Sequence, residues 1–480
     1  MAITSASQTR AAAVQATLSD NYLDIQNNGW AQQYLPDLME QEAEVFGKRT
    51  ISGFLAQVGA EEAMSADQVV WSEQGRLHLS YKGTIGTHTT STIQLDTDID
   101  GVDVGTTHGV RVGDTVLIAS AALTVRAFVS QINSDTNGDQ NTGATDFITA
   151  IPYDAEHLDN SGFGTNDAVT ILVYGSEHSK GTTGKVGANE PSFTSFTNKP
   201  IIMKDMYQVS GSDASQVGWV EVSGEDGQNG YMWYLKAEGD TRSRFADYTE
   251  MALVEAEKAA DASTILGGAN GLVGTEGLFS AISNRGHQTS GVTGVNAATD
   301  LAEFDAILAE FDKNGAIEEN MLFLNRATSL AFDDMLASMN SYGAGGTSYG
   351  VFDNNEDMAL NLGFSGFRRG SYDFYKSDWK YLNDLSTRGG INARNVAGAI
   401  RGVIIPAGTS SVYDEQMGKN LKRPFLHVRY RASQTESRKM KTWITGSVGA
   451  VTSDLDAMTV NFLTERCLVV QAANNFMLMN

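Results

Sequence analysis

The sequence predicts an α+β protein that carries an all-β domain inserted in its first half. Three observations predict this class. Residues 84–184 consist of short β-rich runs between glycine and acidic turns. A strand-like stretch at Ile201–Ser210 precedes a long helix candidate at Thr241–Ala260. Between Pro200 and Pro406 no proline occurs, and helical and strand patterns alternate there, which is typical of mixed α and β layers.

The composition limits the class of protein to which this chain can belong. The 480 residues are 41% hydrophobic and 19% charged, an ordinary globular composition with ample material for a core. The single Cys467 excludes a disulfide framework and a cysteine-based zinc site, and its apolar surroundings predict a buried thiol rather than a reactive one. There is no apolar run long enough to span a membrane and no secretory signal pattern, so we expect a protein that stays in the cytoplasm where it is made.

The first 50 residues are predicted to form an arm with one short helix at Leu35–Phe46. Large apolar side chains are isolated there among polar ones. We therefore take Trp30, Tyr34 and Phe46 as anchors that dock onto another surface rather than as parts of a core.

After the arm, Val69–Tyr81 is predicted to be one two-faced strand, because Leu77, Leu79 and Tyr81 alternate with polar residues. The composition then changes. From 84 to 184 helical periodicity is almost absent, and this segment is predicted to be a β-barrel or a β-sandwich. Between Thr92 and Lys180 it holds 13 acidic residues against three basic ones, so we expect it to be well solvated. The strand candidates are Thr92–Leu95, Val110–Ile118, Leu123–Gln131, Phe147–Pro152 and Ala168–Tyr174.

The long helix at Thr241–Ala260 is predicted to bury one stripe made of Phe245, Tyr248 and Ala252, broadened by Met251 and Val254. Twenty helical residues span roughly 30 Å, the length of a rigid strut.

Beyond this helix the glycine-dense stretch Leu266–Gly294 is interpreted as a loop with brief helical turns. Asp300–Lys313 is predicted to be an amphipathic helix, and Met321–Leu324 a short buried strand. Another helix, with Leu330, Phe332, Met335, Leu336 and Met339, follows that strand. Further strands are predicted at Ala399–Ile405, Phe425–Tyr430, Thr442–Val448 and Cys467–Val470.

Charge is spread unevenly along the chain. The net charge is −24, yet Ser365–Lys441 holds 15 Lys and Arg residues against six acids. The overall acidity argues against a free-standing nucleic-acid binder. We expect the basic segment to meet an acidic surface on a neighbouring copy; contact with a polyanion and a plain solvated face are the alternatives. The candidates for subunit contacts or for facing the lumen of an assembly are Arg368, Arg369, Arg423, Arg429 and Arg431.

One acidic run resembles half of a calcium loop. Asp96, Asp98 and Asp100 with Gly101 match positions 1, 3, 5 and 6 of an EF-hand, but position 12 is Thr107 instead of glutamate. We interpret the run as an acidic turn, with a weak calcium site as the alternative.

No catalytic motif is complete. The histidines lack metal-binding spacing, Ser365 lacks the second glycine of a nucleophile elbow, and the phosphate-loop-like 181–185 lacks its leading glycine. We therefore expect no enzymatic activity and no cofactor.

The order of these parts resembles a tailed-bacteriophage major capsid protein of the Hong Kong 97 fold. Met206–Ser210 leading to Thr241–Ala260 resembles the exit of that fold's extended loop into its spine helix. Leu463–Val470 followed by Asn475–Leu478 resembles its closing strand. The β-rich insertion is an addition that many members of the family lack.

The resemblance implies a division of the chain into seven parts. They are an N-terminal arm (1–50), an extended loop with a peripheral-domain strand (51–83), the inserted β-domain (84–184), the return strand of the loop (185–212), a peripheral domain with the spine helix (213–299), an axial domain (300–455) and a closing peripheral strand (456–480).

The resemblance also implies a function. The chain would assemble with copies of itself into hexamers and pentamers of an icosahedral shell around double-stranded DNA, which it would contact non-specifically. A separate scaffolding protein, a portal and a decoration protein would be partners, and a membrane would not. Assembly would take place in the host cytoplasm, and the final location would be the virion. The alternative function is a secreted, calcium-binding, adhesin-like surface protein, and an enzyme ranks third.

Overall fold

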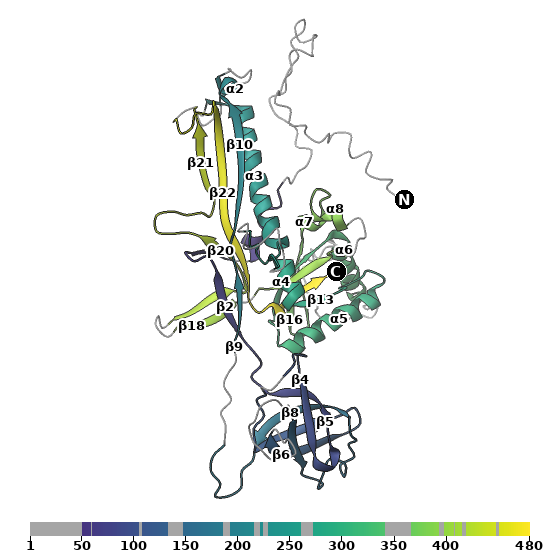
Figure 1. The fold of residues 1–480 in the computed structure, drawn as a ribbon. Helices are drawn as coiled ribbons and strands as arrows, with labels where there is room; N and C mark the ends of the chain where they lie inside the picture. Colours follow the sequence, from purple (N-terminus) through teal and green to yellow (C-terminus); the bar gives the residue numbers. More distant parts are fainter. Residues whose placement is uncertain are drawn as a thin grey trace. The chain divides into compact units, whose positions relative to one another are not determined.

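The computed structural model describes residues 50–480, apart from gaps at 59, 105–107, 133–146, 186–192, 216–220, 224–228, 261–271, 341–365, 393–397, 408, 415–418 and 448–450. The predicted arm helix and its anchors Trp30, Tyr34 and Phe46 lie outside the described residues. The chain divides into two compact units at Trp71/Ser72 and at Phe196/Thr197. We call Ser72–Phe196 the barrel unit and the rest of the described chain the main unit (Figure 1).

The barrel unit contains a closed barrel in which each strand pairs with two antiparallel neighbours. Its strand order is β3-β4-β7-β6-β5-β8, and β8 closes back onto β3. Alternating apolar residues fill the interior, as Val125, Ala127 and Val129 of β6 show. The strands are β3 (Ser80–Ile85), β4 (Thr92–Asp98), β5 (Asp114–Ala119), β6 (Thr124–Ile132), β7 (Phe147–Pro152) and β8 (Ala168–Ser176), with a 3₁₀ turn η1 (His88–Thr90).

Two paired strands join the units. β2 (Val69–Gln74) leaves the main unit, and β9 (Phe193–Asn198) returns to it beside β2. The prediction of one continuous strand over Val69–Tyr81 is therefore wrong. β2 and β3 are separate strands; Leu77 between them is 89% exposed, whereas Tyr81 is buried inside the barrel.

The first sheet of the main unit is organised around one long strand. β22 pairs with β10 along one edge, and on its other edge with β20 and then β21. β1 adds to β20 in parallel. The strands are β1 (Glu61–Met64), β10 (Ile201–Ser210), β20 (Leu426–Arg431), β21 (Lys441–Gly446) and β22 (Ala457–Val470).

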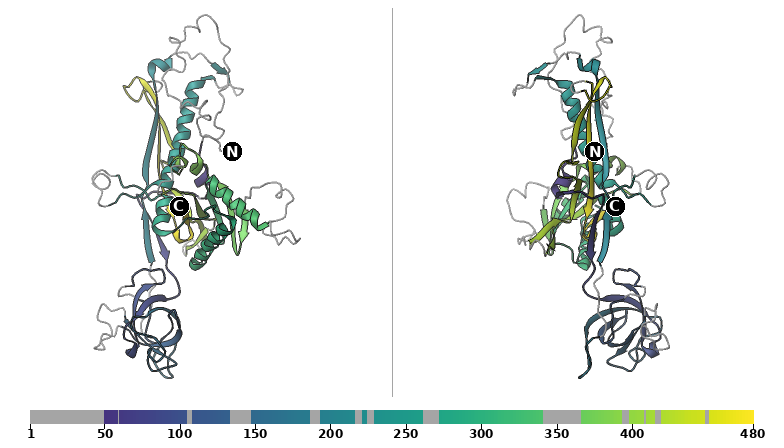
Figure 2. Two further views of the ribbon diagram at one scale, coloured as in Figure 1. Left: turned by 90° about the vertical axis from the view of Figure 1, so that its right-hand side faces the viewer. Right: turned by 60° about the vertical axis from the view of Figure 1, so that its left-hand side comes forward.

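The long helix α3 (Met232–Glu255) runs beside β10 and β22 (Figures 1 and 2). Phe245 packs there against Val460 and Phe462 of β22. The buried stripe follows an i, i+4 spacing that includes Thr249, which donates its hydroxyl hydrogen bond to the Phe245 carbonyl 2.8 Å away. The predicted stripe was wrong at Tyr248, which is 47% exposed. Thr249, a small side chain whose hydroxyl bonds to its own helix, allows a closer approach to the sheet than a tyrosine would.

The second sheet of the main unit has helices on both faces. Its order is β13-β23-β17-β14-β16-β15. In β17, Ile404 lies in the core formed with α5 and α6, whereas Val403 and Ile405 lie in the core formed with α4 and α7. The elements are α4 (Leu278–Arg285), β13 (His287–Thr289), α5 (Ala297–Asn314), β14 (Glu319–Leu324), α6 (Arg326–Asn340), β15 (Gly366–Arg369), β16 (Tyr372–Asp378), α7 (Lys380–Asn383), β17 (Gly402–Pro406) and β23 (Met477–Met479). The last strand thus joins this sheet, whereas we expected 456–480 to return as a whole to the domain of the long helix.

The interpretation of Leu266–Gly294 as a loop was wrong for its second half, because α4 is a buried helix there. Its glycines serve close packing. A Cβ at Gly277 would lie 2.8 Å from backbone atoms of Val254 and Ala256, and one at Gly286 would lie 2.8 Å from the Ala473 carbonyl oxygen.

Short elements complete the described chain. They are α1 (Phe54–Val58), α2 (Gly211–Ser215), the pair β11 (Glu221–Ser223) and β12 (Asn229–Tyr231), α8 (Arg388–Asn392), the pair β18 (Thr409–Asp414) and β19 (Lys419–Pro424), and the 3₁₀ turn η3 (Ala473–Asn475). Among the described helices, none has the length and apolar character to cross a membrane.

Candidate assembly surfaces

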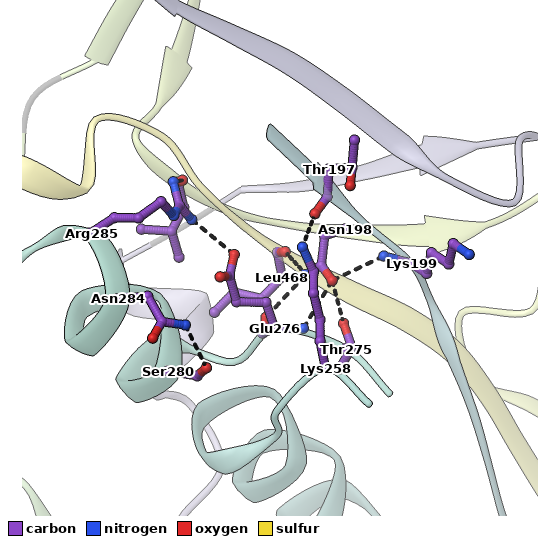
Figure 3. A network of polar contacts seen from close by, with 11 residues as sticks. Thr197, Asn198, Lys199, Lys258, Thr275, Glu276, Ser280, Asn284, Arg285 and Leu468 are labelled. Carbon is purple, nitrogen blue, oxygen red and sulfur yellow. Dashed lines mark hydrogen bonds and ion pairs between the residues drawn. The ribbon is translucent and has the colours of Figure 1, made fainter. Parts of the chain in front are cut away.

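The return of the chain into the main unit is fixed by one buried side chain, that of Asn198 at the end of β9 (Figure 3). Its Nδ2 donates to the carbonyl oxygens of Leu468 (2.6 Å) and Glu276 (3.0 Å). Its Oδ1 accepts from the main-chain nitrogens of Glu276 and Lys199, both at 2.9 Å, and from the Thr275 hydroxyl at 3.1 Å. A buried amide is costly unless its hydrogen bonds are made, and here both of its polar atoms have partners. Asn198 therefore ties β9 to β22 and to the chain that enters α4.

The outgoing strand is fixed close to the same place. The Arg285 guanidinium lies 5.6 Å from the ring centroid of Trp71 in β2, and its Nη2 is 2.8 Å from Glu276 Oε2. Lys258 donates from the other side to the Thr197 carbonyl. Both strands that connect to the barrel unit are thus anchored on the main unit by charge-assisted contacts.

One face of the first sheet is open around Asn461 of β22, although Leu463 and Cys467 on the same side are buried. The α3 side holds Val460 and Phe462, so the intervening Asn461 lies on the opposite side, opposite Met206 of β10 and Trp443 of β21. Met206 is 60% exposed on this side and Ile202 is 54% exposed. Ile202 and Met206 share this side of β10 with Lys204 between them, and large apolar residues exposed on one sheet face are typical of an interaction surface.

The chain that follows the predicted arm docks on the main unit. The Phe54 ring stacks on Trp379 with centroids 4.2 Å apart and meets Phe323 edge-on at 4.7 Å. Two carboxylates of α3 accept main-chain hydrogen bonds from the same segment. Asp247 accepts from residues 51 and 52 at 3.0 Å, and Glu250 accepts from residue 53 at 2.6 Å. Burial raises the pKa of Glu250, although these amide donors act in the opposite direction.

Several described basic residues of the second half form ion pairs within the chain. Arg429 Nη2 lies 2.8 Å from Glu62 Oε2, and Arg431 pairs with Asp67. Arg466 Nη1 lies 3.0 Å from Glu61 Oε1. These acids precede β2, so ion pairs reinforce the short parallel pairing of β1 with β20.

The other candidates of the basic segment lie elsewhere. Arg369 forms a bidentate pair with Asp305 at 2.5 and 2.7 Å, and Arg368 lies 3.6 Å from Asp373; both arginines are in β15. The Arg423 side chain lies outside the described part. The structure thus separates Arg368 and Arg369 from Arg429 and Arg431, and it gives each of these four an acid of its own chain. Pairing with acids far apart in sequence could not be foreseen from the basic segment alone.

The three calcium candidates do not converge on one point. Asp100 forms a bidentate pair with Arg76, Asp96 accepts from the Thr84 hydroxyl at 2.5 Å, and Asp98 accepts from a main-chain nitrogen of its own turn at 2.9 Å. Asp96 and Asp98 belong to strand β4 rather than to an EF-hand loop. Across the described residues, no group of three or more His, Cys, Asp or Glu side chains is arranged to hold a metal ion.

Cys467 is buried in β22, as predicted, and burial raises the pKa of its thiol to about 12. Sequence reasoning missed Asn198, Trp71 and Arg285. The only signal was the position of Asn198 just before the strand Ile201–Ser210.

Comparison with known proteins gives no match to a protein-family model and none to a curated protein. Solved structures do match. "Microbacterium phage Oxtober96" is 9% identical with a TM-score of 0.36, over 95% of this chain and 99% of that chain. "Mycobacterium phage Adephagia" is 8% identical with a TM-score of 0.36, over 95% and 98%. "Capsid structure of the Cyanophage P-SCSP1u" is 11% identical with a TM-score of 0.33, over 64% and 80%.

These three solved structures come from phages. Their TM-scores lie below 0.5, so these likenesses assign no function to this chain.

Proposed function

We propose that this chain is a shell-forming subunit, the major capsid protein of a tailed phage with a Hong Kong 97-type fold. One observation carries the proposal. The long sheet is covered by α3 on one face only, and Ile202 and Met206 stay exposed on the other. A sheet face of this kind gains its partner when a neighbouring copy binds.

The paired strands β2 and β9 support the same function. They form a sheet of two strands only. Such a ribbon is marginally stable by itself, and docking on a neighbour stabilises it. The anchors at Asn198 and Trp71 hold its base on the subunit that owns it.

The assembled form, the partners and the roles of the parts of the fold follow from the same proposal. Contacts between unlike surfaces of identical copies close into rings, here hexamers and pentamers, and rings with curvature close into an icosahedral shell. The shell encloses double-stranded DNA in the virion after assembly in the host cytoplasm. A scaffolding protein, a portal and a decoration protein are the proposed partners. The barrel unit is the proposed insertion, α3 the spine helix, and the second sheet the axial domain. This role is structural, and we propose no catalysis.

We do not propose the calcium-binding surface protein, because no described contact favours it. Each of Asp96, Asp98 and Asp100 is engaged with a different partner.

The test is assembly in vivo. The full chain is co-expressed with a scaffolding protein encoded beside it, and particles are isolated on a gradient and viewed by electron microscopy. We expect closed shells from the natural chain and from the conservative variant I202V/M206L. The variant I202D/M206D should remain folded by circular dichroism but form no shells. Unimpaired assembly of I202D/M206D would contradict the role of the open face.

A further inference from the structure

Strand β10 forms one edge of the first sheet, and among the described residues it pairs only with β22. Its ten residues keep a single register with β22, without a bulge. Gly211, directly after the strand, donates its main-chain N–H to the Asp456 carbonyl oxygen 3.0 Å away. Main-chain groups alternate in direction along an antiparallel strand. The N–H and C=O groups of the even-numbered residues in 202–210 therefore point away from β22.

This edge lacks the features that keep strand edges from pairing. β10 contains no proline, and Lys204 is the one charged residue among the outward-pointing positions. Ile202 and Met206, which flank that lysine, are 54% and 60% exposed. The Met206 N–H donates to the Asp205 carboxylate at 2.8 Å, a contact that the carbonyl of another strand would replace. We therefore expect a strand of another chain to cover this edge.

The helix beside this edge has an exposed flank on the same side. Arg244 of α3 lies 3.6 Å from Asp205 of β10, so this flank lies over β10. Tyr248 follows Arg244 by one helical turn on the same flank and is 47% exposed. The edge thus has two layers, a strand and a helix, and a second copy presents the same two layers. Pairing of two β10 strands would bring the two helices to about 10 Å apart, an ordinary helix-packing distance.

The sequence of β10 is complementary to itself in an antiparallel register. The register in which Met206 faces the same residue of the second copy pairs every outward-pointing position of 202–210. Lys204 then lies opposite Gln208, so no like charges face each other. A register centred on Lys204 would oppose two lysines, and one centred on Asp205 would oppose two carboxylates. Registers displaced further pair fewer residues.

The charges at the two ends of β10 support the same pairing. Lys199 precedes the strand and Asp213 follows it, and both residues are exposed. In the antiparallel arrangement the Lys199 end of each copy lies beside the Asp213 end of the other. Close to the centre, Asp205 and Arg244 of each copy already form an ion pair. Opposite charges thus meet at both ends of the contact.

We propose that β10 pairs with β10 of a second copy across a two-fold axis at Met206, which joins the two sheets into one. The place of this contact rests on the proposed function: rings that form a shell also touch one another, and a two-fold contact joins two equal rings. The pairing itself rests on β10 and α3 alone.

The first test is disulfide cross-linking of the purified full chain under mild oxidation. Residues that face each other in this way have Cα atoms about 5.5 Å apart, within the range of a disulfide. We expect M206C to cross-link at least about tenfold faster than L330C, which alters a 52% exposed residue of helix α6. K204C and Q208C should each match L330C when alone, but their mixture should give the heterodimer rapidly. The natural Cys467 is buried.

The second test removes one donor of the edge. Q208P deletes an outward-pointing N–H and leaves the hydrogen bonds to β22 in place, whereas Q208A removes the side chain and keeps the N–H. Sedimentation of the full chain should show that Q208P dimerises at least about tenfold more weakly than Q208A. Circular dichroism checks that both variants are folded.

Cross-linking of M206C at the rate of L330C would overturn the proposal, and so would equal dimerisation of Q208P and Q208A. Cross-linking of K204C alone as fast as M206C would overturn the register. Shells formed equally well by Q208P would overturn the place of this contact in the shell and leave the proposed function standing. A chain that forms no shells but cross-links rapidly through M206C would contradict the proposed function and support the pairing.

Discussion

The side-chain nitrogen of Asn198 lies 2.6 Å from the carbonyl oxygen of Leu468, 270 residues away in the sequence. This hydrogen bond joins the end of β9, which returns from the barrel unit, to the longest strand of the main unit. The contact is fully buried, so it fixes where the chain returns from the barrel unit to the main unit.

We expect N198A to lower the free energy of unfolding of the main unit by about 2–4 kcal/mol, because it leaves several buried main-chain groups unpaired. Urea unfolding of the full chain, followed by tryptophan fluorescence, measures this. The matched control is N284A, which removes an exposed side chain with a single 3.4 Å contact to Ser280. Similar losses in both variants would contradict the role of Asn198.

The packing of α3 gives a second prediction. F245A removes a 1% exposed ring from the contact with Val460 and Phe462, and we expect a loss of about 3–5 kcal/mol. Y248A removes a half-exposed ring from the same helix and should cost less than about 1 kcal/mol. Denaturant unfolding of both variants measures the two losses of unfolding free energy. A larger loss in Y248A than in F245A would show that the stripe with Tyr248 faces the sheet.

The raised pKa of Glu250 gives a pH dependence. Because the folded pKa lies above the usual value of 4.5, the folded state binds more protons and stability is lost as pH rises from 4.5 through the folded value. E250Q removes this loss, and its carbonyl oxygen still accepts from residue 53. The stability of E250Q relative to the natural chain should therefore increase from pH 4 to pH 7, as measured by urea midpoints. The exposed-site variant E257Q should show no such trend, and a flat difference for E250Q would contradict the assignment.

We expect the main unit to fold when the barrel unit is deleted. Replacing 75–191 with Asn-Gly removes the whole barrel and joins β2 directly to β9. We expect the unfolding midpoint of the main unit to be retained and particles to be weaker. Replacing only 84–184 should instead leave most of β3 without its partners β4 and β8 and lead to aggregation. Loss of the main-unit transition in the first variant would show that the barrel unit is needed for folding.

Sequence reasoning was most successful where periodicity was strong. The helix predicted at Asp300–Lys313 is confirmed within α5, and Phe304, Ile307 and Phe311 are buried as its spacing predicts. The strand at Met321–Leu324 is confirmed within β14. Local patterns of this kind are set by which face meets the core.

The failures share a physical cause, namely that distant contacts decided the outcome. Gly277 and Gly286 suggested a loop, but they let α4 approach other backbones closely. Two arginines of the basic segment pair with Glu62 and Asp67 of the same chain, which are distant in sequence, and contact of this segment with a neighbouring copy stays a prediction. The one local signal of Asn198 is its position just before the strand Ile201–Ser210, because its partners lie in segments that only the fold brings together.

The most direct test of the central claim is an electron cryomicroscopy reconstruction of particles formed by the full chain with its scaffolding protein. We predict a closed shell in which a neighbouring copy covers Ile202 and Met206 and holds the ribbon of β2 and β9. A stable lone monomer under all conditions, or a shell in which that sheet face stays bare, would contradict it.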